Sequence, residues 1–219
     1  TKNKINQELT NSNSKYKYPH INNNISDKND TSLEHMAMAR AIEELLIEKN
    51  IFSTEEMQKT LKKIDLQNPK QGARLVARAW VDSNFKDRLL KDVRSAAKEI
   101  DIDIGPIRIL AIENTSNLHN AIVCTLCSCY PKHLIGLPPE WYKSGNYRSR
   151  MISEPRSVLA EFGTVISNNV ELRVYDSTTE VRYLVIPMLP ENYIGLNENE
   201  LIALVTRDSM IGTSIIKTH

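Results

Sequence analysis

Apolar residues recur at helical spacing through most of the first hundred positions. Two Ser/Thr-x-x-Glu capping boxes mark the starts of helices expected at 31–50 and 53–64. The stretches 71–82 and 83–100 keep the same periodicity, and Ser83 is the expected cap between them. The first half of the chain is therefore predicted to be mainly helical.

The second half alternates apolar and polar positions, which is typical of strands. A helical stretch in its middle is interrupted at Pro155, and a closing helix is expected at about 197–207. Helices that lead into mixed strands indicate an α+β fold. Strands are expected at residues 107–112, 118–123, 170–176 and 180–188.

Composition suggests three parts. Residues 1–30 are rich in Asn, Lys, Ser and Asp and poor in apolar groups, so we expect a flexible arm. The region 31–100 is the helical segment, and 101–219 is an α/β domain that carries all the cysteines and is the expected metal-binding domain.

Charge and hydropathy exclude some partners. The net charge is +1, and no basic run is interleaved with aromatic residues, so no nucleic-acid partner is expected. No apolar stretch is long enough to span a membrane, and the start of the chain lacks the apolar core of a secretory signal. We expect a cytoplasmic protein without a membrane partner.

The chain has three cysteines, and all of them lie within six consecutive positions, in VCTLCSCY. This clustering argues against a disulfide framework. Soft sulfur donors at Cys124, Cys127 and Cys129 suit a transition metal, whereas a structural zinc site normally needs a fourth ligand. His119 could be imagined in that role, but a histidine on the preceding strand more often packs. Backbone amides or an exchangeable water would then complete the coordination.

The segment VCTLCSCY, followed by LIGLPPEWYKSGNYRSR, resembles the metal-binding loop of nitrile hydratase alpha subunits. EPRSVLAEFG, YDSTTEVRYLVIP and LVTRDSMIG are also similar to that family, so the resemblance covers about residues 35–212. It implies a layered α/β/β/α arrangement and the hydration of a nitrile to an amide.

The resemblance also implies a ligand set. The thiolates of Cys124, Cys127 and Cys129, with the backbone nitrogens of Ser128 and Cys129, would bind one low-spin Co(III) or Fe(III) per chain, and Thr125 resembles the cobalt type. Cys127 would be oxidised to a sulfinic acid and Cys129 to a sulfenic acid. The sixth position would hold water or substrate, and the oxygen on Cys129 is a candidate nucleophile or base.

Several polar positions match those that the family keeps near the metal, although alternating strands also expose polar residues to solvent. Trp141 is expected to pack and to wall the substrate pocket, and Lys132 is expected beside it. The remaining candidates around the metal and the pocket are Lys143, Asp176, Glu180, Arg182 and Tyr183.

The chain also departs from the family pattern. Lys132 and His133 stand where most nitrile hydratases have Trp-Pro, and Gly105 falls near a position where many carry Gln. The gamma subunit of thiocyanate hydrolase has a basic residue at the position of Lys132, so thiocyanate hydrolysis is the alternative activity. A non-catalytic, structural metal site is a third possibility.

The family also implies a partner. A beta-type subunit would supply arginines to the oxidised sulfurs, so we expect a heterodimer or heterotetramer. The N-terminal arm is predicted to wrap that partner.

Overall fold

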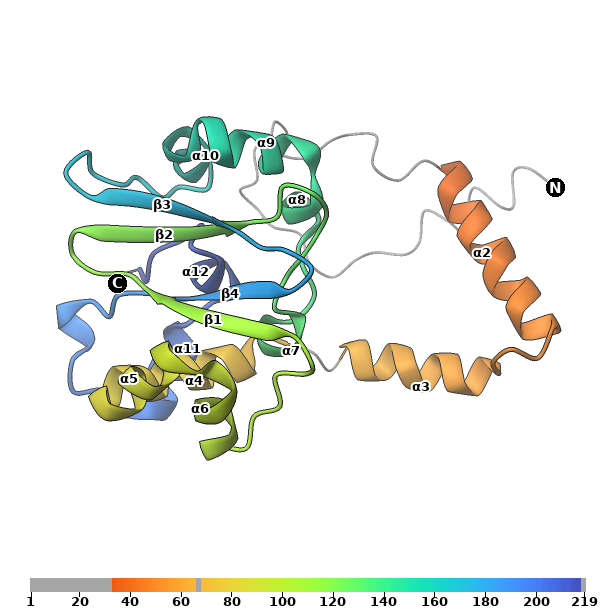
Figure 1. Ribbon diagram of the computed structural model, residues 1–219, viewed down its shortest axis with the longest axis horizontal. Coiled ribbons are helices and arrows are strands. Elements are labelled where there is room, and N and C mark those ends of the chain that lie inside the picture. Colours follow the sequence, from red (N-terminus) through yellow and green to blue (C-terminus); the bar gives the residue numbers. More distant parts are fainter. Residues whose placement is uncertain (1–32, 66–67, 218–219) are drawn as a thin grey trace.

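The computed structural model describes residues 33–65 and 68–217. Two N-terminal helices stand away from a body that contains the four strands (Figure 1). The predicted arm at residues 1–30 lies outside the described residues. The helices that precede the strands are α2 (Leu33–Glu48), α3 (Thr54–Asp65), α4 (Lys70–Val81), α5 (Ser83–Lys91) and α6 (Val93–Glu99).

The region predicted as two helices, 71–82 and 83–100, contains three helices, and aspartate side chains cap the second and the third. The Asp82 side chain accepts a hydrogen bond from the Phe85 N–H at 2.9 Å, so Asp82 caps α5 and the prediction of Ser83 was wrong. The Asp92 side chain accepts from the N–H groups of Arg94 and Ser95. It thereby starts a new helix inside the stretch predicted as one.

The four strands form two parallel pairs, in which strands that follow each other in sequence do not pair. A short turn joins β1 to β2, and another joins β3 to β4, and the chain reverses direction at each turn. β1 then pairs in parallel with β4, and β2 pairs in parallel with β3. The pairing inside each sheet is therefore parallel, where mixed strands were expected. The strands are β1 (Arg108–Glu113), β2 (Leu118–Val123), β3 (Glu171–Asp176) and β4 (Val181–Ile186), paired as β1 with β4 and β2 with β3.

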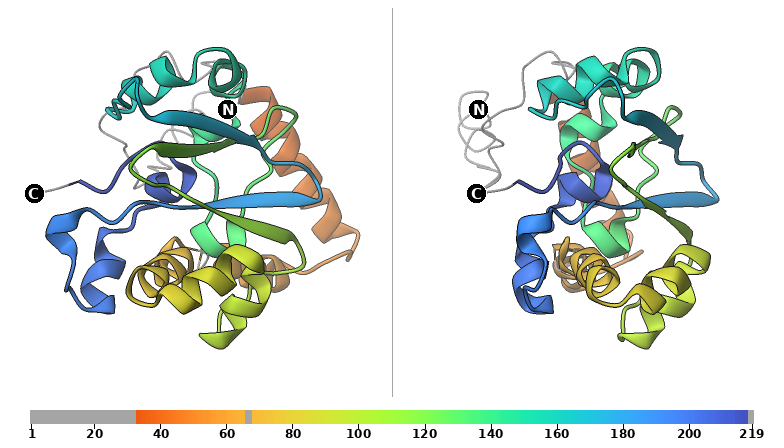
Figure 2. Two further views of the ribbon diagram at one scale, coloured as in Figure 1. Left: turned by 60° about the vertical axis from the view of Figure 1, so that its left-hand side comes forward. Right: turned by 90° about the vertical axis from the view of Figure 1, so that its left-hand side faces the viewer.

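This topology brings distant residues to one edge of the strands. The register pairs Val123 at the end of β2 with Asp176 at the end of β3, and Ile109 near the start of β1 with Arg182. The views in Figures 1 and 2 show β2 and β4 as neighbours between the outer strands. The loop after β2 and the start of β4 therefore lie at the same end.

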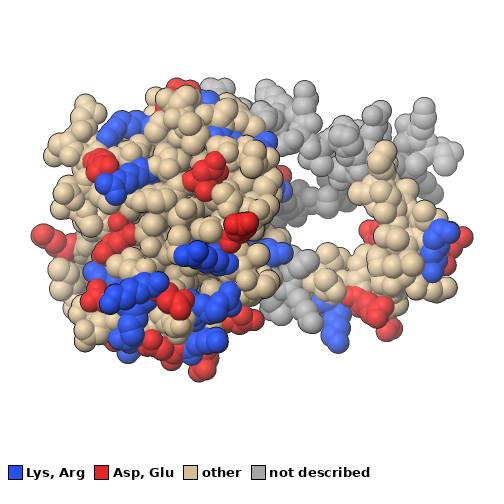
Figure 3. Space-filling model, in the orientation of Figure 1, with Lys and Arg blue, Asp and Glu red and all other residues tan. Residues whose placement is uncertain are grey.

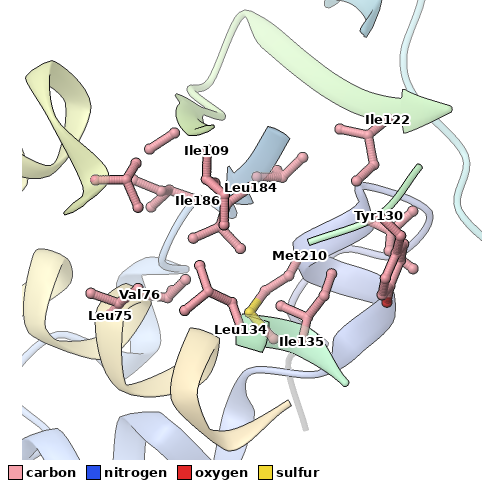
Figure 4. Packing of buried hydrophobic residues seen from close by; sticks show 14 of the residues in the cluster. Leu75, Val76, Ile109, Ile122, Tyr130, Leu134, Ile135, Leu184, Ile186 and Met210 are labelled. Atoms are coloured by element: carbon pink, nitrogen blue, oxygen red, sulfur yellow. The ribbon is translucent and has the colours of Figure 1, made fainter. Parts of the chain in front are cut away.

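The remaining helices close the body around these strands, and α4 contributes its apolar face to the same core. Leu75 and Val76 of α4 pack toward Leu184 and Ile186 of β4 (Figure 4), and each fully buried aliphatic side chain contributes about 1.5–3 kcal/mol. The later helices are α7 (Lys132–Ile135), α8 (Glu140–Lys143), α9 (Gly145–Ser153), α10 (Pro155–Glu161), the 3-10 helix η1 (Glu191–Tyr193), α11 (Glu198–Leu204) and α12 (Arg207–Ile211).

The distribution of charge on the surface and the hydropathy of the helices agree with the expectations from the sequence. Basic and acidic side chains are interspersed on the face seen in Figure 3, as the net charge of +1 suggests. Within residues 33–65 and 68–217, no helix has the length and apolar character needed to cross a membrane.

The end of α12 packs closely against β2. Gly212 has φ +87°, and a Cβ added there would lie 2.1 Å from the carbonyl oxygen of Asn120. Gly163 has a similar φ of +81°, but an added Cβ would meet nothing within 4 Å.

We predict that Gly212→Ala lowers the free energy of unfolding by more than about 3 kcal/mol, because left-handed strain and overpacking add. Gly163→Ala should cost only the strain, about 1–2 kcal/mol. Denaturant unfolding of both variants measures the difference, and equal losses would contradict this account of the contact with β2.

Candidate metal centre

The three cysteines occupy the loop that directly follows β2. Cys124 and Cys129 are buried, while Cys127 is exposed. The sulfur of Cys127 lies 3.5 Å from that of Cys124 and 3.2 Å from that of Cys129. All three sulfurs lie within 4.8 Å of one another, so one ion could contact them together. A set of three soft donors fits a transition metal.

Side chains from neighbouring helices hold the backbone of this loop, which belongs to no helix or strand. The Tyr142 hydroxyl of α8 donates to the Cys129 carbonyl at 2.9 Å. Arg148 of α9 donates across the loop to the carbonyls of Thr125 and Cys127, at longer distances of 3.5 and 3.4 Å. The Cys127 N–H in turn donates to the Cys124 sulfur at 3.2 Å.

Asp176 fixes the other side of the loop. Its carboxylate accepts from the Thr125 N–H at 2.9 Å and from the Thr125 hydroxyl at 2.5 Å. The strand register explains this contact, because Asp176 ends β3 directly opposite Val123 and the Ser177 N–H donates to the Val123 carbonyl at 2.7 Å. The parallel pair thus delivers a carboxylate to the first turn of the cysteine loop.

The surroundings shift the pKa values of Cys127 and Cys129 in opposite directions. Burial, followed by the hydrogen bond with Cys127, raises the pKa of Cys129 to about 12. Hydrogen bonds from Cys129 and Cys124 lower the pKa of Cys127, and the backbone N–H groups of Ser128 and Cys129 add to this effect.

A cavity of about 400 Å³ opens beside the sulfurs. Its wall combines aliphatic side chains with the cations Lys132 and Arg182, and no carboxylate occurs among its lining residues in the described part of the chain. It is lined by Ile104, Ile107, Ile109, Cys127, Ser128, Cys129, Tyr130, Pro131, Lys132, His133, Pro138 and Arg182.

Besides Asp176, which contacts the loop, four of the candidates around the site are not among the lining residues of the cavity. Trp141 is 2% exposed and packs between aromatic rings, with its ring centroid 4.6 Å from that of Phe162. Lys143 pairs with Glu140 at 2.8 Å. Glu180 is exposed in the turn before β4, and the Tyr183 ring lies 5.0 Å from that of Tyr175.

His119 is engaged elsewhere. Its Nδ1 accepts from the Asn114 side-chain amide at 3.3 Å and its Nε2–H donates to the Gly212 carbonyl at 2.8 Å. Burial lowers its pKa, which agrees with a neutral ring. This placement matches the expectation of a packed histidine.

Sequence reasoning did not single out Tyr142 and Arg148 as residues that shape the loop. Both side chains donate to backbone carbonyls, and because every residue has a carbonyl, such a contact requires no particular residue type that a sequence pattern could reveal. The isoleucines of the cavity wall could have been found, because Ile104, Ile107 and Ile109 belong to a segment that leads into β1 and repeats isoleucine at every second or third position.

The fold and the site together define an α+β protein in which three clustered thiols could hold a metal ion beside a small cavity. The family model for the nitrile hydratase alpha chain matches residues 33–214. The chain belongs to this family of enzyme subunits.

Named relatives cover nearly the same length. The nitrile hydratase alpha subunit of a Rhodococcus species is 45% identical over 191 residues, which span 86% of this chain and 96% of the relative. The low-molecular-weight cobalt-containing nitrile hydratase alpha subunit of Rhodococcus rhodochrous is 44% identical, over 84% and 90%. The thiocyanate hydrolase gamma subunit of Thiobacillus thioparus is 39% identical, over 81% and 78%.

Solved structures confirm the α+β class. An iron-type nitrile hydratase from Comamonas testosteroni matches with a TM-score of 0.80 at 33% identity, over 85% of this chain and 92% of the other. A recombinant thiocyanate hydrolase with partially modified cobalt centres matches with a TM-score of 0.78 at 36% identity, over the same shares.

We predict that Asp176→Asn lowers the free energy of unfolding by about 1–2 kcal/mol, because the amide can replace only one of the two acceptor oxygens that Thr125 uses. Thr125→Ser keeps both donors and should change stability little. Thr125→Val removes the hydroxyl alone, and its effect should be smaller when Asp176→Asn is already present than in the wild type. Full additivity in denaturant unfolding would contradict a direct contact.

In the metal-free chain, we predict that iodoacetamide labels Cys127 about tenfold or more faster than Cys129 at pH 8. Cys127 is exposed with a lowered pKa, whereas Cys129 is buried with a raised one, and the thiolate is the reactive form. Peptide mapping after timed labelling measures the order. Faster labelling of Cys129 would show that the loop adopts another shape.

Proposed function

We propose that this chain is the metal-carrying catalytic subunit of a cobalt nitrile hydratase, which adds water to a nitrile to give the amide. The observation that carries the proposal is the convergence of three thiols beside a small cavity. The cobalt-containing relative from Rhodococcus rhodochrous, at 44% identity, supports cobalt as the metal. Fe(III) is the less favoured choice, because the iron-type neighbour is only 33% identical.

The residues present fit such an ion. Cys124, Cys127 and Cys129 would bind it as thiolates, and the amide nitrogens of Ser128 and Cys129 would complete the protein ligands. When bound, one Co(III) per chain would supply Lewis-acid polarisation of the nitrile and of water. Oxidation of Cys127 to sulfinic and of Cys129 to sulfenic acid is part of the proposal.

The remaining groups would serve binding and orientation. Ile104, Ile107 and Ile109 give the cavity a wall that excludes water from the alkyl end of a nitrile. Arg182 would place positive charge beside the oxidised sulfurs, and Asp176 would hold the loop in shape. Trp141, Lys143, Glu180 and Tyr183 would support the site from outside the wall.

A beta-type partner subunit belongs to the proposal, in a heterodimer or heterotetramer. Met38, Ile42 and Leu45 are 48–62% exposed and recur at helical spacing along α2, which stands away from the body (Figure 1). An exposed apolar stripe of this kind suits burial against another chain. The arm before α2 would continue onto the same partner.

One observation favours thiocyanate as the alternative substrate. Lys132 and Arg182 give the cavity wall two cations without a carboxylate among its lining residues, and this charge would draw in an anion. The similarity to the thiocyanate hydrolase gamma subunit agrees with that reading. A non-catalytic structural metal site is the third candidate.

Assays on the purified complex separate the three. The proposal expects amide from a small nitrile, one cobalt per chain, and an intact mass raised by three oxygen atoms. Carbonyl sulfide and ammonia from thiocyanate, without amide from any nitrile, would establish the alternative. No turnover at full cobalt loading and full oxidation would favour the structural role.

We predict that Cys129→Ser removes cobalt and lowers nitrile turnover at least about 100-fold, since it removes one donor of the ligand set. Leu126→Ala changes the same loop at a side chain that is 85% exposed and should still bind cobalt. Elemental analysis of both variants provides the comparison. Full cobalt content in the Cys129→Ser protein would overturn the assignment of this ligand.

A further inference from the structure

The ring of His133 occupies the space above Gly105. A Cβ added at residue 105 would lie 2.6 Å from Cδ2 and 2.7 Å from Nε2 of the imidazole. Packed side chains do not approach so closely. A side chain at residue 105 and the ring of His133 therefore exclude each other, and the ring forms part of the cavity wall instead.

The backbone beneath the ring is fixed. Gly105 has φ +71°, its N–H donates to the Asp103 carboxylate at 2.8 Å, and its carbonyl accepts from Arg94 at 2.8 Å. These hydrogen bonds hold both polar groups of the peptide backbone at this position. The His133 ring therefore packs against a backbone segment that hydrogen bonds hold in place.

The helix that carries His133 is held from its other side. Leu134 and Ile135 of α7 are fully buried, and a Cβ added at Gly72 of α4 would lie 2.7 Å from the Ile135 side chain. Figure 4 shows Leu134 and Ile135 packed beside Met210 in the core. The α7 backbone cannot retreat from the cavity without opening this packing.

We propose that His133 is a specificity-determining residue, which limits the size of the nitrile that reaches the cysteine cluster. The inference rests on the proposed function, because it concerns the substrate of the same site. The His133 ring packs against Gly105 and lines a cavity of about 400 Å³. The volume of the ring therefore reduces the space that a substrate can occupy.

The test compares acetonitrile and benzonitrile as substrates of the complete complex. His133→Ala should raise the kcat/KM ratio of benzonitrile to acetonitrile about tenfold or more, since a few atoms in a pocket discriminate on that scale. His133→Phe keeps a ring and should keep the ratio within about twofold. Leu137→Ala, exposed just after α7 and outside the cavity wall, is the matched control and should also keep it.

A second readout does not use activity. Gly105→Ala should lower the thermal midpoint more than Gly163→Ala, because only the former meets a neighbouring ring. Adding His133→Ala to Gly105→Ala should recover part of that loss, which indicates direct coupling between the two positions.

Three results would overturn parts of the account separately. An unchanged substrate ratio in His133→Ala, with an active wild type, overturns the inference alone. Additive losses of Gly105→Ala and His133→Ala overturn the contact on which it rests. A wild-type complex that hydrates neither nitrile overturns the proposed function, and the inference falls with it.

Discussion

To hold the proposed ion, three sulfur atoms must stay close together, although the loop that carries them belongs to no helix or strand. Neighbouring elements meet this constraint with side chains. Tyr142 and Arg148 hold carbonyls on one side of the loop, and Asp176 holds the backbone and hydroxyl of Thr125 on the other. The parallel pairing of β2 with β3 shapes the loop because it places Asp176 beside Thr125.

Local signals in the sequence describe much of the fold. The capping box at Ser53 and the strand that runs into Cys124 both lie where the pattern indicates. Strand pairing was not predictable in the same way, because alternation identifies a strand but not its partner. Ser83 was wrong for a similar reason, since two neighbouring polar residues can each cap a helix and only the geometry selects Asp82.

In the candidate site, too, some features could be predicted from local sequence and others depend on the fold. Cysteine spacing points to the cluster, whereas Trp141 turns out to be enclosed by aromatic rings, which hydropathy alone could not distinguish from a cavity wall. Gly105 and His133, two positions at which the sequence was expected to differ from the family pattern, lie next to each other in space, because a Cβ at residue 105 would overlap the His133 ring. The sequence separates these two positions by 28 residues, and only the fold shows that they are neighbours.

The central claim is that the three sulfurs close on a single ion. X-ray absorption at the cobalt edge of the purified complex measures this most directly. The account predicts sulfur atoms in the first coordination shell, accompanied by lighter nitrogen or oxygen donors. A first shell of nitrogen and oxygen alone would contradict it.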